Sequence, residues 1–279
     1  MLEANSSYSY SHGVQLLERM VQEFGPIFTI EQITSSVENQ QLSSRQIQKV
    51  ISKLASAGWI EIIKRGTYVV KSPLYAGDIS SFAIAAALVQ PMAISHWSAL
   101  AYYGFTTQSP AMIQASTPHK VVTPEMRSGK AYSPRGRAAW RAFGLEFEFI
   151  YTKKELFWGF QRIWVDSWQQ VGVTDPERTT LDLITRPDVF GGIRSATEIL
   201  EGAISQINVE QLVSYALRYD VGAVIKRLGW ILEKIGVPSD HLYPLQKYPV
   251  QGYCRLDPNQ PKSEKLNPRW RINENLIRT

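Results

Sequence analysis

LSSRQIQKVISKLASAGW, residues 42–59, has the spacing of an amphipathic helix. Ser43 is a suitable N-cap, Gln46 three residues later can complete a capping box, and Gly58 can end the helix. Apolar side chains recur at intervals of three and four residues, which places them on one helical face; they are Ile47, Val50, Ile51, Leu54 and Ala57. This stretch therefore predicts a helix with one buried face.

The opposite face of this helix has no acidic residue. A merely solvated face usually mixes Glu with Lys, because opposite charges four residues apart stabilise a helix. Arg, Lys, Gln and Ser side chains are the ones that bind base edges and phosphates. We expect this face to bind DNA, with Lys53 mainly on phosphates and the other members on base edges or nearby phosphates: Ser44, Arg45, Gln48, Lys49 and Ser52.

The neighbouring segments complete a small domain. Helical spacing over residues 12–24 and 30–37 predicts two further helices before the basic one. After it come two short runs rich in β-branched and aromatic residues, 59–63 and 67–70, which predict a hairpin. Three helices and a hairpin predict a winged helix-turn-helix over residues 1–75, with Lys64 and Arg65 at the wing on phosphates. A winged fold that binds protein is the weaker alternative.

The remaining residues, 76–279, are expected to form a larger, mainly helical domain with a small sheet, so that the fold class is α+β. Alternating or β-rich patterns predict strands near residues 113–115, 145–151, 163–165 and 171–174. Asp175 is a suitable cap for the helix that Pro176 and Glu177 begin, and Asn208 for another. Residues 116–142 are expected to be a loop or loose hairpin, and the stretch from Pro244 to Pro268 a polar tail.

Charge is concentrated in two blocks, although the whole chain has a net charge of only +5. Residues 43–71 contain six basic residues and one acidic residue, and residues 118–141 have the same numbers. Two basic blocks on an otherwise neutral chain indicate two places that meet a polyanion, although solvated surface is an equally good interpretation of the second. The second block's candidate phosphate ligands are Arg127, Lys130, Arg135, Arg137 and Arg141.

Several classes of protein are disfavoured by the motifs. The chain has no Gly-Ser pair with closely spaced aspartates, no Glu-x-Lys, no phosphate-binding GxxxxGK and no GxSxG, so an enzyme is not expected. The four histidines are scattered and the single cysteine, Cys254, stands alone, so neither a zinc site nor a cofactor is expected. Without an apolar run of about 20 residues or a secretory leader, we expect a cytoplasmic protein with no membrane association.

Two side-chain groups have a structural interpretation. Asp175 looks like a helix cap and Arg178–Asp182 like an ion pair along that helix, so a structural role is favoured over catalysis. Tryptophans are more often core residues than stacking platforms, which we expect here for Trp97, Trp158, Trp164, Trp168 and Trp230.

Short segments spread along residues 12–276 match a known family in order and spacing. The most specific is Val173-Thr174-Asp175-Pro176-Glu177-Arg178-Thr179-Thr180-Leu181-Asp182. The others are Arg65-Gly66-Thr67-Tyr68-Val69, Ala83-Ile84-Ala85, Pro91-Met92-Ala93-Ile94-Ser95, Ser98-Ala99-Leu100, Tyr103-Gly104-Phe105-Thr106, Pro187, Gly191-Gly192, and the runs 227–233 and 270–275. Together they resemble the AbiEi antitoxins of bacterial type IV toxin–antitoxin, or abortive-infection, systems. Residues before His12 and the proline-rich tail match least.

The resemblance implies two roles for the protein. The N-terminal domain would bind inverted repeats in its own promoter as a dimer and repress the operon. The larger domain, 76–279, would neutralise a nucleotidyltransferase toxin encoded next door, without a stable complex between the two proteins, and would contribute basic residues to the DNA contact. Two alternatives stay open: a transcription factor whose larger domain senses a ligand, and a nuclease targeted by a winged domain.

Overall fold

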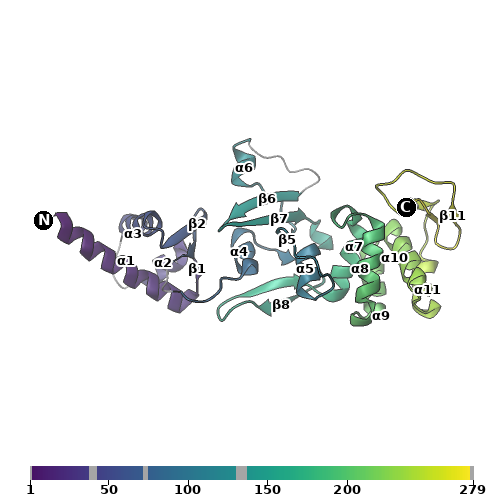
Figure 1. Ribbon diagram of the computed structural model, residues 1–279, viewed down its shortest axis with the longest axis horizontal. Helices are drawn as coiled ribbons and strands as arrows, with labels where there is room; N and C mark the ends of the chain where they lie inside the picture. Colours follow the sequence, from purple (N-terminus) through teal and green to yellow (C-terminus); the bar gives the residue numbers. More distant parts are fainter. Residues whose placement is uncertain (1, 38–42, 72–74, 130–136, 277–279) are drawn as a thin grey trace. The chain divides into compact units, whose positions relative to one another are not determined.

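The computed structural model describes residues 2–37, 43–71, 75–129 and 137–276 of an α+β chain of helices and small sheets (Figure 1). The chain divides into two compact units. The first contains residues 1–92, 119–149 and 162–171, and the second contains 93–118, 150–161 and 172–279. The units therefore do not follow the chain as two blocks, because the first adds three later segments to the predicted domain of residues 1–75.

The N-terminal part of the first unit has three helices and three strands. The helices are α1 (Leu2–Phe24), α2 (Ile30–Val37) and α3 (Ser44–Ser56), and the strands are β1 (Ile27–Thr29), β2 (Ile60–Lys64) and β3 (Thr67–Val70). The strands form an antiparallel sheet in the order β1-β3-β2. The α1 helix begins ten residues before the predicted position. The three helices and the sheet enclose one apolar core, which includes Leu17, Met20, Phe28, Ile33, Ile47, Ile51, Leu54 and Tyr68.

Local chemistry fixes both ends of the segment that carries the basic face. The capping box is present: the Gln46 backbone N–H donates to Ser43 Oγ, and the Ser43 N–H donates to Gln46 Oε1 at 2.8 Å. After β2, the turn at Arg65 and Gly66 requires a positive φ of 75° at the glycine, where a side chain would be strained. The Gly66 carbonyl then accepts the backbone N–H of Ile30, which ties the turn to the start of α2.

A six-stranded sheet has the order β6-β7-β5-β4-β9-β8. In its middle, β4 pairs antiparallel with β5, Ile94 opposite Ala115, and parallel with β9, Ile94 opposite Val173. Two short helices, α4 (Ser81–Leu88) and α6 (Pro124–Arg127), lie on the chain between these strands or before them. The strands are β4 (Ala93–Ile94), β5 (Ile113–Thr117), β6 (Arg137–Ala142), β7 (Leu145–Tyr151), β8 (Phe160–Trp164) and β9 (Gln170–Thr174).

Helices dominate the second unit, and α7 to α10 pack around a large apolar core (Figure 1). Asp175 caps α7 and Asn208 caps α9, as predicted. The α-helices are α5 (His96–Tyr102), α7 (Pro176–Thr185), α8 (Ile193–Ala203), α9 (Val209–Tyr219), α10 (Gly222–Lys234) and α11 (Ser239–Lys247). Short 3₁₀ turns are η3 (Lys154–Leu156), η4 (Pro187–Val189) and η5 (Ile204–Gln206).

Two predictions of irregular structure were wrong in part. Residues 116–142, expected to be a loop or loose hairpin, include the end of β5, the short helix α6 and all of β6. The expected polar tail begins inside α11, which contains Pro244, and then supplies β10 (Cys254–Arg255) and β11 (Leu266–Asn267). These two strands form a small sheet with β12 (Ile272–Asn273), which follows the tail. Buried Leu256, Trp270 and Ile272 hold this segment to the helical core.

Within the described residues, no helix has the length and apolar character needed to cross a bilayer.

Candidate nucleic-acid interface

The α3 helix separates its apolar and basic side chains onto two faces. Ile47, Ile51 and Leu54 are buried in the core that α3 shares with α1 and α2. The predicted DNA-binding positions are all exposed, and their spacing of three and four residues places them in one stripe: Ser44, Arg45, Gln48, Lys49, Ser52 and Lys53. The structure thus brings these six predicted residues together on one solvent-facing surface.

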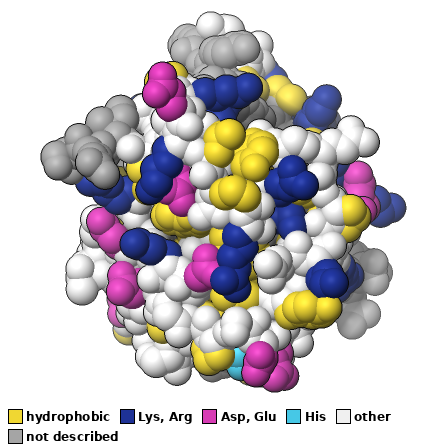
Figure 2. Space-filling model, turned by 90° about the vertical axis from the view of Figure 1, so that its right-hand side faces the viewer, with side chains coloured by type: hydrophobic (Ala, Val, Ile, Leu, Met, Phe, Trp, Pro, Cys, Tyr) yellow, Lys and Arg dark blue, Asp and Glu magenta, His cyan; other side chains and the backbone are white. Residues whose placement is uncertain are grey.

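Two cations in this stripe keep their hydrogen-bond donors available. Within the described part of the chain, Arg45 and Lys49 form no ion pair or side-chain hydrogen bond. The stripe also contains no carboxylate, because α3 has no Asp or Glu. By contrast, the molecular face in Figure 2 mixes Lys and Arg with Asp, Glu and apolar side chains, as ordinary solvated surface does. Arg45 and Lys49 can therefore offer positive charge to a polyanion.

The turn between β2 and β3 supplies one exposed cation, not two. Arg65 is exposed. Lys64, however, is half-buried, and its Nζ donates to the Leu88 carbonyl in α4 at 3.1 Å. Burial lowers the pKa of Lys64. Lys64 was predicted to contact phosphates beside Arg65, but its hydrogen bond to Leu88 directs the ammonium group toward α4.

The second basic block is only partly free to bind an anion. Arg127 is exposed at the end of α6. Arg137 forms a bidentate ion pair with Glu148, with both hydrogen bonds at 2.8 Å, and exposed Arg141 pairs with Glu146 at 2.7 Å. Lys130 and Arg135 lie outside the described residues. Cross-strand pairing thus occupies two of the five predicted phosphate ligands, which the sequence pattern could not reveal.

Glu61 connects the strand after α3 to the β6–β7 hairpin of the same unit. Its Oε1 accepts the backbone N–H of Phe143 at 2.7 Å, and its Oε2 pairs with Lys71 at 2.9 Å. Glu61, the one acidic residue of the first basic block, therefore serves a structural purpose away from the α3 stripe.

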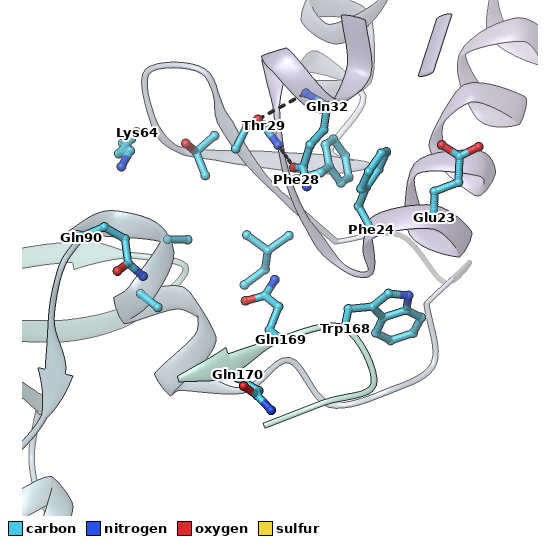
Figure 3. A pocket seen from close by; sticks show the side chains of 14 residues that line it. Glu23, Phe24, Phe28, Thr29, Gln32, Lys64, Gln90, Trp168, Gln169 and Gln170 are labelled. Atoms are coloured by element: carbon cyan, nitrogen blue, oxygen red, sulfur yellow. Dashed lines mark hydrogen bonds between the residues drawn. The ribbon is translucent and has the colours of Figure 1, made fainter. Parts of the chain in front are cut away.

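A pocket of about 540 Å³ lies in the first unit beside the start of α2 (Figure 3). We call it the Trp168 pocket; it is lined by Glu23, Phe24, Ile27, Phe28, Thr29, Gln32, Lys64, Thr67, Ala86, Ala87, Gln90, Trp168, Gln169 and Gln170. Figure 3 shows Lys64 and Gln90 toward one end and Phe24 and Trp168 toward the other. Sequence reasoning did not find this pocket, because its lining comes from segments up to 147 positions apart, from 23 to 170.

The tryptophan prediction is correct for some positions and wrong for others. Trp158 is buried, and Trp97 and Trp230 pack against the helical core. Trp164 is 66% exposed and Trp168 is 39% exposed. Neither of these two is a core residue, and Trp168 opens onto the pocket.

The motif from Asp175 to Asp182 has the structural role that the sequence favoured. Asp175 accepts the Arg178 N–H at 2.7 Å, and buried Arg178 pairs with Asp182 at 2.9 Å. The Arg178 Nη1 also donates to the carbonyls of Leu156 and Trp158, and its guanidinium lies 4.9 Å from the Trp158 ring centroid. This arginine therefore fixes residues 156–158 to α7.

The fold is shared with a known α+β structure. The chain is similar to the crystal structure of the RV2827C protein from Mycobacterium tuberculosis, with a TM-score of 0.62 and 15% sequence identity, over 94% of this chain and 90% of that one. At this identity the likeness shows the fold alone. No family model and no curated protein matches the chain.

Proposed function

We propose that this protein binds double-stranded DNA through α3, and that its N-terminal helices and strands form a winged helix-turn-helix. The order α1-β1-α2-α3-β2-β3 with an antiparallel sheet supports this assignment. In that fold the helix at the position of α3 enters the major groove, and the β2–β3 hairpin is the wing. The observation that carries the proposal is the exposed, acid-free stripe of α3.

The dimensions of the stripe suit the reading of a short sequence. Arg45 and Ser52 are seven residues apart on α3, which is about 10 Å along the axis and about three base-pair steps of DNA. Arginine binds guanine bidentately and glutamine binds adenine in the same way, so Arg45 and Gln48 are the residues that would read bases. Lys49, Lys53 and Arg65 would hold the phosphate backbone, which makes binding dependent on salt.

Fluorescence anisotropy tests this proposal directly. The purified protein is titrated onto DNA from upstream of its own gene and onto scrambled DNA over a series of salt concentrations. We expect a preference for the upstream DNA that the double variant Arg45→Ala/Lys49→Ala loses. The control Lys234→Ala/Lys262→Ala also removes two exposed positive charges, but in the second unit, and should keep the preference.

The two double variants distinguish DNA binding through α3 from attraction of DNA by the net positive charge of the protein. Equal loss in both double variants would mean that net charge, and not α3, attracts DNA. No preference of the unaltered protein for upstream over scrambled DNA would overturn sequence-specific binding at that site.

The biological role rests on the resemblance to AbiEi antitoxins alone. Accordingly, we propose that the protein binds inverted repeats of its own promoter as a dimer, represses the operon and neutralises a cognate nucleotidyltransferase toxin. The larger domain, residues 76–279, would carry the antitoxin role without a stable complex. Co-expression with the neighbouring gene tests this role, because a toxin would stop growth and the antitoxin would restore it. If the variant Arg45→Ala/Lys49→Ala still restores growth, neutralisation belongs to a part of the protein other than the DNA-binding face. If the unaltered protein does not restore growth, the antitoxin role is refuted.

A further inference from the structure

The indole of Trp168 is held in place while a large part of it stays open to solvent. The backbone N–H groups of Trp168 and Gln169 both donate to Asp166 Oδ1, at 2.8 and 2.7 Å, which fixes the loop before β9. On the other side the ring lies against Gly25, where an added Cβ would come within 2.8 Å of the indole. Trp168 nevertheless remains 39% exposed and lines the Trp168 pocket. A rigid, accessible indole is a surface on which a planar ring can stack.

Glutamine amides are the most frequent polar groups in the lining of the pocket. Gln32, Gln90, Gln169 and Gln170 all line the pocket (Figure 3). Gln32 uses its Oε1 to accept the Thr29 N–H at 2.7 Å, which leaves its NH₂ group as a donor. Each remaining amide presents both a donor and an acceptor, the combination that matches the edge of a nucleobase. The pocket is therefore lined by groups that recognise a planar ring with polar edges.

The pocket also contains one cation whose charge is not balanced within it. Lys64 donates one of its three N–H groups to the Leu88 carbonyl, and two N–H groups remain as donors. The other charged lining residue, Glu23, is already paired with Arg19 at 3.2 Å and accepts a hydrogen bond from Ser36. An anionic group on a ligand would thus find Lys64 available, at the end of the pocket away from Trp168 (Figure 3).

From these three features we propose that the Trp168 pocket binds a nucleotide, with the base stacked on Trp168 and hydrogen-bonded by the glutamines, and with the phosphate on Lys64. The volume of about 540 Å³ lies within the range of roughly 300–1,000 Å³ that is usual for small-molecule sites. The site is independent of the proposed DNA contact, because none of the predicted base-reading residues of α3 lines it.

Isothermal titration calorimetry with the full chain tests the proposal. The probes are AMP, GMP, CMP and UMP, followed by the nucleoside and the ribose 5-phosphate that correspond to the tightest binder. We expect one or more nucleotides to bind, and either fragment to bind at least tenfold more weakly, since each lacks one of the two recognised ends. No binding of any of the four at millimolar concentration would overturn the proposal.

Matched variants locate the binding. Trp168→Ala should weaken nucleotide binding at least tenfold, whereas Trp164→Ala, which removes an even more exposed indole outside the pocket, should leave it unchanged. Lys64→Met should weaken the nucleotide but not the nucleoside. Thermal melting of each variant confirms that it is folded. Binding that is lost in Arg45→Ala/Lys49→Ala but kept in Trp168→Ala would place the nucleotide on α3 and overturn the site, whatever the outcome for DNA.

Discussion

Trp270 lies directly against Gly229, so that a Cβ on this glycine would collide with the indole. The indole is fully buried, and its Nε1 donates to Glu233 Oε2 at 2.7 Å. Gly222 lies on the same helix, α10, seven residues before Gly229. The C-terminal segment approaches α10 at both glycines, with Trp270 at Gly229 and Val250 at Gly222.

Replacement of Gly229 should therefore destabilise the second unit. We expect Gly229→Ala to lower the free energy of unfolding by about 1–3 kcal/mol, the usual cost of overpacking a core. Gly202→Ala is the matched control, because Gly202 is an exposed glycine of α8 with no heavy atom within 4 Å of an added Cβ. Since alanine is the better helix former, the control should be neutral or stabilising. Urea unfolding measures both; equal effects would contradict the contact.

Removal of Arg178 should lower the stability of the fold strongly, because Asp182 would then be buried without a partner. The side chains of this pair are 4% and 3% exposed, and breaking such a pair costs about 3–5 kcal/mol. We expect a loss of that order for Arg178→Met. The double variant Arg178→Met/Asp182→Leu should recover part of the loss, since no buried charge remains. A double variant that is less stable than the single one would show that the loss comes from the contacts to residues 156–158.

The stability of the C-terminal segment should depend on pH through Glu274. Burial of its carboxyl raises the pKa, but hydrogen bonds from Lys265, Asn267 and Trp230 outweigh this and lower it from 4.5 to about 2. A carboxyl with a lowered pKa in the folded state stabilises the protein above its unfolded pKa, and this contribution is lost as the pH falls through the folded value.

Accordingly, the free energy of unfolding should fall between about pH 5 and pH 2, partly because of this group. The difference between the unaltered protein and Glu274→Gln should be largest near neutral pH and shrink toward pH 2. Glu264→Gln changes an exposed carboxylate of the same segment and serves as the control. Urea unfolding at several pH values measures the difference; one that is constant with pH would rule out Glu274 as its source.

The elements that the sequence predicted well are those set by local chemistry. Ser43, Asp175 and Asn208 each cap the helix expected of them, because a cap and its N–H partner are three residues apart. The segments it missed depend on distant partners. The strands β10 to β12 have two residues each and exist through pairing with one another, and β6 follows a stretch in which proline and glycine suggested a loop.

The same distinction holds for the candidate sites. Helical periodicity alone places Arg45, Gln48 and Lys49 on one exposed face, so the α3 stripe could be foreseen. The partner of Lys64 is a backbone carbonyl 24 residues later, which no side-chain pattern announces. Trp168 packs against Gly25, more than 140 positions earlier in the chain, so the sequence pattern around the tryptophan could not give its environment.

Neighbouring cations of the β2–β3 turn should differ in their effect on DNA binding. If the proposed interface is correct, exposed Arg65 binds a phosphate, and Arg65→Ala should reduce the slope of log affinity against log salt by about 0.9, the value for one phosphate contact. Lys64→Ala should leave that slope unchanged, because Lys64 Nζ donates to Leu88. Lys64→Ala should instead lower stability, since the Leu88 carbonyl loses its lysine donor.

Anisotropy titrations over a salt series, with urea unfolding of each variant, measure the salt dependence and the stability. A reduced slope in Lys64→Ala would show that the lysine leaves α4 to bind DNA, whereas an unchanged slope in Arg65→Ala would remove the turn from the interface and leave α3 to bind alone.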